Sequence, residues 1–319
     1  MSRSVKIWLT IASALVLTGV IIIGSVMTVF NWDFSKLSTS KFETNLHETS
    51  EDFTDISVNT DTADIAFLPS EDGECRVECF ENVKANHAVT VSDGTLFINL
   101  ENKRNWYDYI MNFNSAKISV YLPKAEYGTL SVKNSTGKVT VPEDFNFSSA
   151  DIVVSTGNVS FSASASGLVN IKTTTGKIEA QNLTAGSMSL TSSTGRMSLT
   201  DVKCDGDISI KVTTGKTLLS AVSCKNLTAG GSTGNISLTG VLVSDKLKVN
   251  RNTGSVTLDG SDAKEISIKT DTGSVKGTLL SEKIFFVETD TGRISVPKTT
   301  SGGKCEIKTD TGNVIISIE

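Results

Sequence analysis

The hydrophobic pattern divides this chain into two unlike parts. From Ile7 to Phe30 the sequence runs for 24 residues without a charged side chain. At about 1.5 Å per residue, a helix of that length spans about 36 Å, which exceeds the bilayer core of about 30 Å. Over residues 130–319, apolar residues recur two positions apart on either side of a Thr-Gly dipeptide, which is the spacing of β-strands. The pattern predicts a transmembrane helix over 7–30 followed by an all-β repeat domain.

The Thr-Gly dipeptides recur every 19 or 20 residues. The positions seven and five residues before each glycine are apolar in all ten repeats, whereas the positions two and four residues after it are interrupted only by Thr217 and Gly277. A glycine at a fixed place indicates a sharp turn with a positive φ. We therefore expect each repeat to form a strand, a turn and a second strand. The expected turn residues are Gly137, Gly157, Gly176, Gly195, Gly215, Gly234, Gly254, Gly273, Gly292 and Gly312.

One such repeat cannot bury its own apolar residues, whereas repeats stacked at about 4.8 Å can. The sequence thus predicts a parallel β-solenoid of about 12 coils with a repeat of 19–20 residues. Apolar residues seven and nine positions after some glycines, such as Val202 and Cys204, leave open whether a coil has two or three sides. Upstream, Ala63 and Gly94 lie where the turn glycine would be, so we expect degenerate coils with insertions over 51–129 and regular coils over 130–319.

The charges beside the apolar segment predict its orientation. Arg3, Lys6 and the terminal amine precede it, and the first charge after it is Asp33. Because positive charge favours the cytoplasmic side, residues 1–6 should form a cytoplasmic head and the rest of the chain should lie outside the plasma membrane. The apolar run is longer than that of a signal peptide, which favours an uncleaved anchor. Residues 31–50 are polar without a sustained pattern and should form a stalk.

Composition and charge offer little support for catalysis. The net charge is −5 and no long block of one sign occurs, which argues against a nucleic-acid partner. The five cysteines are sparse and lack a paired C-x-x-C arrangement, so they predict neither a zinc site nor a disulfide framework. His47 and His87 are the only histidines and lie far apart in sequence. We therefore expect no catalytic residues, no cofactor and no metal site.

Asp-Thr-Gly occurs at Asp271, Asp290 and Asp310 and is also the signature of aspartic proteases. Those enzymes bring two aspartates together so that they share one proton. Here the three copies lie one repeat apart along the same turn row, so we interpret them as turn residues that cap their own backbone.

The densest aromatic group falls in an insertion of the N-terminal part. It comprises Trp106, Tyr107, Tyr109 and Phe113. Aromatic side chains in a loop are typical of a contact site for a protein or a sugar. They could equally cover the N-terminal end of the solenoid, because such an end needs protection against edge pairing. We therefore regard this loop as a candidate partner-binding site or cap.

The segments ISVNTDTADIAF and SVYLPKAEYGTLSVKNSTGKVTV, followed by serial STG and TDTG turns, resemble the bacterial putative-adhesin family of β-strand-repeat proteins. The resemblance covers about residues 50–319 of this chain. It implies a surface protein without catalytic residues that could be carried over to this sequence. We expect a noncatalytic surface-binding or envelope-scaffold module, whose partners are the membrane and a protein or glycan at the cell surface. The alternative is the ectodomain of an envelope-stress or signalling system that works with a membrane partner.

Overall fold

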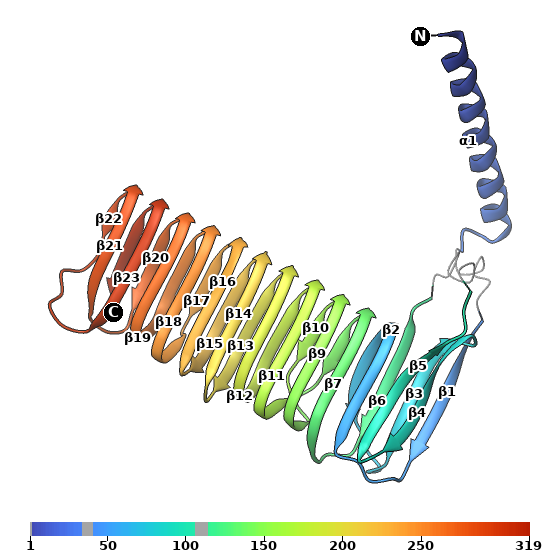
Figure 1. Cartoon of the computed structure of the whole chain (residues 1–319), viewed down its shortest axis with the longest axis horizontal. Coiled ribbons are helices and arrows are strands. Elements are labelled where there is room, and N and C mark those ends of the chain that lie inside the picture. The colour runs from blue at the N-terminus through green and yellow to red at the C-terminus, as the bar shows by residue number, and fades with distance from the viewer. Residues whose placement is uncertain (1, 34–40, 106–113) are drawn as a thin grey trace.

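The computed structural model describes residues 2–33, 41–105 and 114–319, and it consists of one apolar helix followed by a parallel β-solenoid (Figure 1). Helix α1 (Arg3–Val29) begins after Ser2, whose hydroxyl accepts a hydrogen bond from the Val5 N–H. The helix is long and apolar enough to cross a membrane. The predicted fold class, an all-β parallel solenoid preceded by a single apolar helix, is confirmed.

In the regular part, each coil places one strand before its Thr-Gly corner and another after it, and neighbouring coils pair in parallel. The register joins equivalent residues, so that Ile171 lies beside Leu190 and Ile178 beside Met197. The strands of this part are β7 (Glu126–Thr136), β8 (Val139–Val141), β9 (Asn146–Thr156), β10 (Val159–Phe161), β11 (Ser164–Thr175), β12 (Ile178–Thr194), β13 (Met197–Cys204), β14 (Asp207–Thr214), β15 (Thr217–Cys224), β16 (Asn226–Thr233), β17 (Ile236–Thr239), β18 (Leu242–Thr253), β19 (Val256–Thr272), β20 (Val275–Leu279), β21 (Lys283–Thr291), β22 (Ile294–Ser295), β23 (Gly303–Thr311) and β24 (Val314–Ile318).

The central coils have three sides. A third row of side chains, which includes Val202 and Val222, is buried together with the two rows that flank the Thr-Gly corner. The chain bends into this third side at a single residue six positions after the corner glycine, where φ is positive. Asn182, Asp201 and Ala221 take this conformation with φ of 54°, 53° and 52°. Asparagine and aspartate tolerate it better than other non-glycine residues, because their short polar side chains can bond locally.

At the Thr-Gly corner, backbone stacks directly on backbone. The N–H of Gly157 donates to the carbonyl of Thr175 in the next coil at 2.9 Å, and the other coils repeat this bond. A Cβ atom at Gly195 would lie 1.8 Å from the carbonyl oxygen of Gly176. Nine of the ten turn glycines also have φ between 128° and 159°. Glycine is therefore required by the close approach of adjacent coils as well as by its conformation.

Inside the same corner, the side chain three residues before the glycine satisfies a backbone group. The hydroxyls of Thr173, Thr270 and Thr309 donate to the carbonyl of the corner glycine in a neighbouring coil, at 3.4, 3.0 and 2.9 Å. These threonines are buried. They form an internal hydrogen-bonded ladder, because an unpaired buried carbonyl would be costly.

Three departures from the repeat, at Arg251, Thr217 and Gly231, meet around one buried side chain. Arg251 occupies this inward position in its own coil, and its Nη1 and Nη2 donate to the Val212 carbonyl at 2.6 Å and to Thr217 Oγ1 at 3.2 Å. The coil between them carries Gly231, where a Cβ would lie 2.2 Å from Nη1. Thr217, which interrupts the apolar row after the corner glycine, is thus the acceptor for a buried guanidinium.

The N-terminal strands are β1 (Phe42–Thr49), β2 (Asp55–Pro69), β3 (Cys75–Asn82), β4 (Ala85–Ser92), β5 (Thr95–Asn102) and β6 (Ala116–Leu122). Among them, β2 continues the solenoid and β5 and β6 pair with it in parallel, whereas β1, β3 and β4 pair antiparallel to their neighbours. Strand β2 is a coil in register with the regular repeats, because Ile56 lies beside Leu130 and Ile65 beside Val139. Ala63 therefore takes the place of the corner glycine, as expected.

Gly94, in contrast, does not form a coil corner. It follows Asp93 in the turn of an antiparallel hairpin between β4 and β5, with φ of 48° and 71° at the two residues. This pair of positive φ values is the conformation that Asp-Gly favours in two-residue hairpins. Strand β3 likewise pairs antiparallel with both β1 and β6. Residues 42–49, which we expected in the stalk, thus form a strand, and β1, β3, β4, β5 and β6 together cap the N-terminal end of the solenoid. We call these five strands the cap.

The order of coils at each end differs from the order of the chain. Strand β2 lies between the β5/β6 layer and the β7/β8 layer. At the other end, β23 lies between β19 and β21, and β24 between β20 and β22 (Figure 1). The last two strands of the chain, β23 and β24, are therefore inserted between the coil of β19 and β20 and the outermost coil, which is formed by β21 and β22. Lys283 reaches from that outermost coil past Gly303 to Asp262, where Nζ and Oδ1 are 2.6 Å apart.

Candidate functional site

A longitudinal groove follows the third corner of the coils, between the third side and the start of the next strand. Several coils carry glycine there, and at Gly186 and Gly206 a Cβ would lie 2.3 Å and 2.7 Å from a backbone carbonyl oxygen of the preceding coil. The surface is therefore hollowed along this corner, because the closely stacked backbones leave no room for side chains. Two hollows of about 260 and 830 Å³ lie over it, and Asp205 lines both. We call these two adjoining hollows together the longitudinal groove.

The floor of the longitudinal groove is an apolar ladder with one residue from each coil. Neighbouring members pair in register, for example Ala185 with Cys204 and Cys224 with Val243. Each retains 3 to 6 % exposure, whereas most members of the other two buried rows have 0 to 2 %. The ladder consists of Tyr127, Phe147, Ala165, Ala185, Cys204, Cys224, Val243 and Ala263.

The walls of the groove are polar. They carry many hydroxyl groups together with charges of both signs, among them Glu126, Asp205, Lys225 and Lys264. The hydroxyl-bearing wall residues are Ser148, Ser164, Ser166, Thr184, Ser223, Ser244, Ser281 and Ser301. An apolar floor between hydroxyl-rich walls is suited to a chain molecule that has both apolar and hydroxyl-bearing faces.

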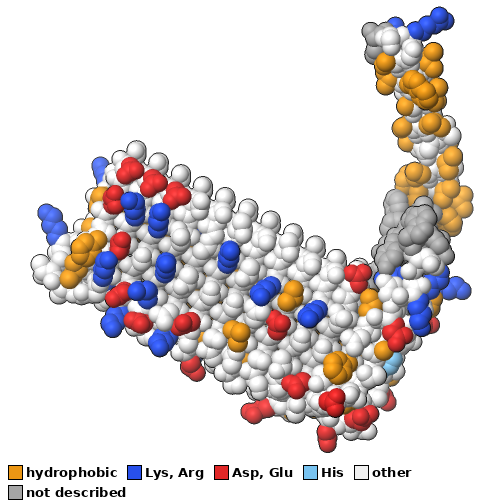
Figure 2. Space-filling model, viewed as in Figure 1, with side chains coloured by type: hydrophobic (Ala, Val, Ile, Leu, Met, Phe, Trp, Pro, Cys, Tyr) orange, Lys and Arg blue, Asp and Glu red, His pale blue; other side chains and the backbone are white. Residues whose placement is uncertain are grey.

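The Thr-Gly edge of the solenoid offers less chemistry. In Figure 2 most of this face is neither charged nor apolar, and acidic and basic side chains lie side by side near its C-terminal end. Lys308 Nζ lies 3.1 Å from Glu288, and Lys269 lies 4.0 Å from Asp271. The hydrogen bond to Glu288 and the nearby Asp290 and Asp310 raise the pKa of Lys308. The aspartates of the Asp-Thr-Gly turns therefore lie in a row beside lysines and do not face one another as a protease dyad requires.

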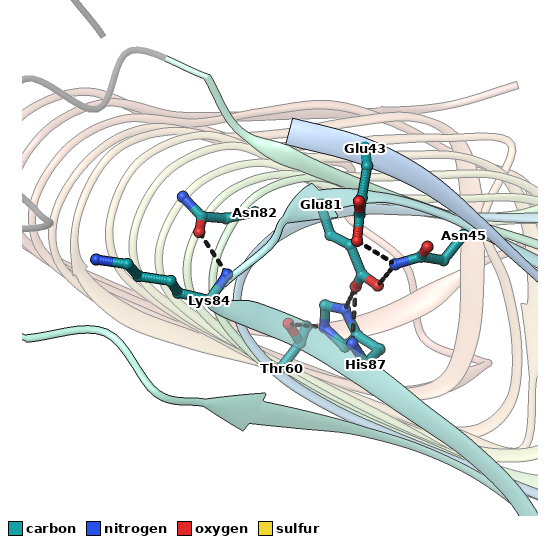
Figure 3. Close-up of polar contacts among 7 residues, drawn as sticks. All are labelled: Glu43, Asn45, Thr60, Glu81, Asn82, Lys84 and His87. Carbon is teal, nitrogen blue, oxygen red and sulfur yellow. Dashed lines mark hydrogen bonds and ion pairs between the residues drawn. The ribbon is translucent and has the colours of Figure 1, made fainter. Parts of the chain in front are cut away.

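The cap encloses a buried polar network (Figure 3). His87 donates its backbone N–H to Glu81 Oε2 at 2.7 Å, and its Nδ1 lies 2.5 Å from the same oxygen. Its Nε2 lies 2.8 Å from Thr60 Oγ1, and Asn45 Nδ2 donates to Glu81 Oε1 at 2.8 Å. Thr60 lies three residues before Ala63 and is therefore equivalent to Thr173 and Thr270 in the regular coils. Its hydroxyl contacts His87, whereas theirs donate to the carbonyl of a corner glycine.

Thr60, His87 and Glu81 stand in the order of hydroxyl, imidazole and carboxylate that hydrolases use. All three are buried, and the adjoining cavity beside His87 has a volume of about 30 Å³, which is enough for a water molecule only. The network therefore serves the structure of the cap. Our sequence analysis missed it, because these residues come together through long-range strand pairing and follow no local motif.

The five cysteines are free and buried. Burial raises the pKa of Cys75 to about 11 and that of Cys305 to about 12. Burial, Glu81 and Glu78 raise the pKa of Cys79 to about 12. Since only the thiolate is a strong nucleophile, these thiols are unreactive at neutral pH. Cys79 also places its sulfur within 4.8 Å of ligand atoms of His47 and Glu81, which the sequence did not indicate.

The predicted aromatic loop of Trp106, Tyr107, Tyr109 and Phe113 lies outside the described residues. Its role as a contact site or a cap stays a prediction. The groove, in contrast, was missed by our sequence analysis, although a signal was present. The glycines nine residues before several corner glycines, such as Gly167 and Gly186, mark the low corner over which the groove runs.

Comparison with known structures gives distant similarities. A putative adhesin from Bacteroides fragilis is 14% identical and covers 88% of this chain and 99% of its own, with a TM-score of 0.42. A putative adhesin from Parabacteroides merdae is also 14% identical and covers 88% and 98%, with a TM-score of 0.46. A putative lipid binding protein from Parabacteroides distasonis is 17% identical and covers 74% and 96%, with a TM-score of 0.44. TM-scores below 0.5 leave these similarities too distant to carry a functional inference.

The comparison with curated proteins finds no match. A protein-family model, in contrast, matches the solenoid and the cap strands other than β1 in two overlapping segments, residues 53–216 and 203–319. These segments hold the repeat and the opening coil on which the resemblance to β-strand-repeat proteins rested. The chain therefore belongs to the family described as Toastrack DUF4097.

Proposed function

We propose that this protein is a noncatalytic, membrane-anchored binding module that holds a glycan chain of the cell surface in its longitudinal groove. The observation that supports this proposal is the groove itself, an apolar ladder between hydroxyl-rich walls. Sugar rings have an apolar face and a rim of hydroxyls, so a polysaccharide lying along the floor would use both kinds of surface. A groove that continues from coil to coil suits a polymer better than a compact metabolite.

The anchor in this proposal is α1, with its N-terminus in the cytoplasm. Arg3 and Lys6 lie at its N-terminal end, and its first turn carries no acidic residue. This arrangement favours retention of the N-terminus inside and display of the solenoid outside the membrane. Figure 2 shows apolar side chains along the length of the helix.

To test this proposal, the full chain in detergent is incubated with insoluble cell-wall polysaccharide and with a glycan array, and the amount of protein retained on each is measured. Ser223 lines the groove, whereas Ser237 lies on the second side of the next coil, and both side chains are half-buried in strands. Ser223→Trp should lower retention about tenfold or more, equivalent to at least about 1.4 kcal/mol. Ser237→Trp should bind like the wild type.

Equal retention of the two variants would rule out the groove as the binding site. No retention of the wild type, together with a membrane protein that co-purifies in a one-to-one ratio, would favour the signalling alternative instead. Cleavage of sugar polymers by the wild type would show that the module is an enzyme.

A further inference from the structure

We propose that the cap holds a zinc ion between His47, Cys79 and Glu81. The three residues lie on two neighbouring antiparallel strands, β1 and β3, in which Asn45 pairs with Cys79 and His47 with Val77. Cys79 and Glu81 are two residues apart and so point to the same face of β3, toward the core. His47 lies diagonally across from Cys79 on the inward face of β1. Side chains on one face of adjacent strands can converge on one ion without any loop.

The distances suit a tetrahedral ion after a small adjustment. The ligand atoms of the three residues all lie within 4.8 Å of one another. Around zinc, with bonds of about 2.0 to 2.3 Å, ligand atoms are about 3.3 to 3.7 Å apart. The side chains must therefore close by about 1 Å, as estimated from these bond lengths. Strand β1 is able to move, because among the described residues it pairs with β3 alone.

Two features of the cap point to a cation, one an unsatisfied nitrogen and the other a buried carboxylate. The Nε2 atom of His47 is buried and has no hydrogen-bond partner. Glu81 is completely buried, and among the described residues its ion-pair partner is His87 alone. His87 holds Glu81 Oε2 through two contacts, while Oε1 accepts from Asn45. Carboxylates that ligate a metal are themselves held in place by hydrogen bonds, as Glu81 is here.

The donor set selects the type of ion. One thiolate, one imidazole and one carboxylate suit zinc, whereas calcium and magnesium require oxygen ligands. On binding, the Cys79 S–H bond is replaced by a sulfur–zinc bond, and the proton leaves to solvent. A water molecule completes the fourth position. The ion would join the edge strand β1, the first described strand after α1, to the strand beneath it.

The experiment uses the full chain in detergent, stripped with a chelator and then titrated with zinc chloride against a chromophoric competitor. We expect one zinc ion per chain. Cobalt chloride should give the absorption band of a thiolate ligand. Cys79→Ser should weaken zinc binding by about 100-fold or more. Cys75→Ser is the matched control, because Cys75 is buried on the same face of β3 but outside the cluster. It should bind as the wild type does.

If Cys79→Ser does not fold, His47→Gln is the variant that tests the site. It should fold, because His47 is only partly buried and lies on an edge strand. It should keep the melting temperature of the metal-free wild type and lose the zinc-induced rise in that temperature. Absence of stoichiometric binding by the wild type would overturn the proposal. Binding in which Cys79→Ser or folded His47→Gln equals the Cys75→Ser control would overturn it too.

Discussion

Arg251 shows how a single residue can alter the pattern of a repeat in neighbouring coils. Burial lowers the pKa of its guanidinium, yet among the described residues its hydrogen-bond partners are a carbonyl and a hydroxyl and include no carboxylate. In the sequence, Thr217 and Gly231 are isolated exceptions to their rows. In the structure, Thr217 accepts a hydrogen bond from this side chain and Gly231 leaves room for it. The two exceptions could be seen in the sequence. That Arg251 accounts for both could not, because the three residues lie in different coils.

A double-mutant cycle should reveal this coupling. Thr217→Val alone should lower the free energy of unfolding by about 1 to 3 kcal/mol, because it leaves a buried guanidinium N–H without an acceptor. In an Arg251→Thr background, which restores the hydroxyl usual at that position, the same change should be neutral or stabilising. Equilibrium denaturation measures both values. A coupling energy close to zero would refute the link between the two residues.

The glycines of the solenoid differ in how strictly they are required. Gly195→Ala should cost more than about 3 kcal/mol of unfolding free energy, because its Cβ would lie 1.8 Å from the Gly176 carbonyl oxygen. Gly240→Ala is the matched control. Its φ is also positive, at 59°, but the nearest atom to its Cβ is 3.9 Å away, and Ala221 takes the same conformation one coil earlier. This control should cost about 1 kcal/mol. Similar losses for the two variants in denaturant unfolding would contradict the role of backbone stacking.

At the scale of elements, the sequence predicted the strands better than their order. The apolar positions around Ala63 identified β2 as a coil, because a row of inward residues with period two can be read locally. The same reasoning failed at Gly94, where Asp-Gly between two alternating segments was the stronger signal for a hairpin. The inserted β23 could not be predicted, since every coil carries the same rows and fits equally well against any other.

Amide hydrogen exchange should show the inserted order. Strand β23 is nearer to the C-terminus than β21, yet it is paired on both sides, whereas β21 is the outermost strand. We expect the amides of Gly303–Thr311 to exchange more slowly than those of Lys283–Thr291. Disruption of the buried ion pair by Asp262→Ala should speed exchange in β21 more than in β19. Faster exchange in β23 than in β21 would contradict the inserted order.

At the scale of the whole molecule, the two ends of the solenoid are unlike. The N-terminal end is covered by the cap, in which β3 pairs antiparallel with β6, and by its buried polar network. At the C-terminal end, the edge strands β21 and β22 expose Phe286 and Ile294, with 54 and 46 % of their surfaces accessible. The repeat predicted a stack but could not distinguish its ends, because the cap depends on pairing between strands that do not follow the repeat.

The orientation of the whole chain is testable in cells. With α1 as an uncleaved anchor, an N-terminal epitope should be retained in the mature protein and be protected from protease added to intact spheroplasts. The solenoid should be digested or labelled from outside. Loss of the N-terminal epitope from the mature protein would identify α1 as a cleaved signal sequence, and protection of the solenoid would reverse the orientation.

The interleaving of coils at both ends has a consequence for how such proteins change in length during evolution. A repeat added after Ile318 would have to displace the outermost coil or leave β24 where it is, and neither gives a longer regular stack. A repeat duplicated between β11 and β18, in contrast, meets the same neighbours as before and leaves both ends intact. Solenoids of this design should therefore gain and lose coils in their middle, while the first and last coils stay recognisable.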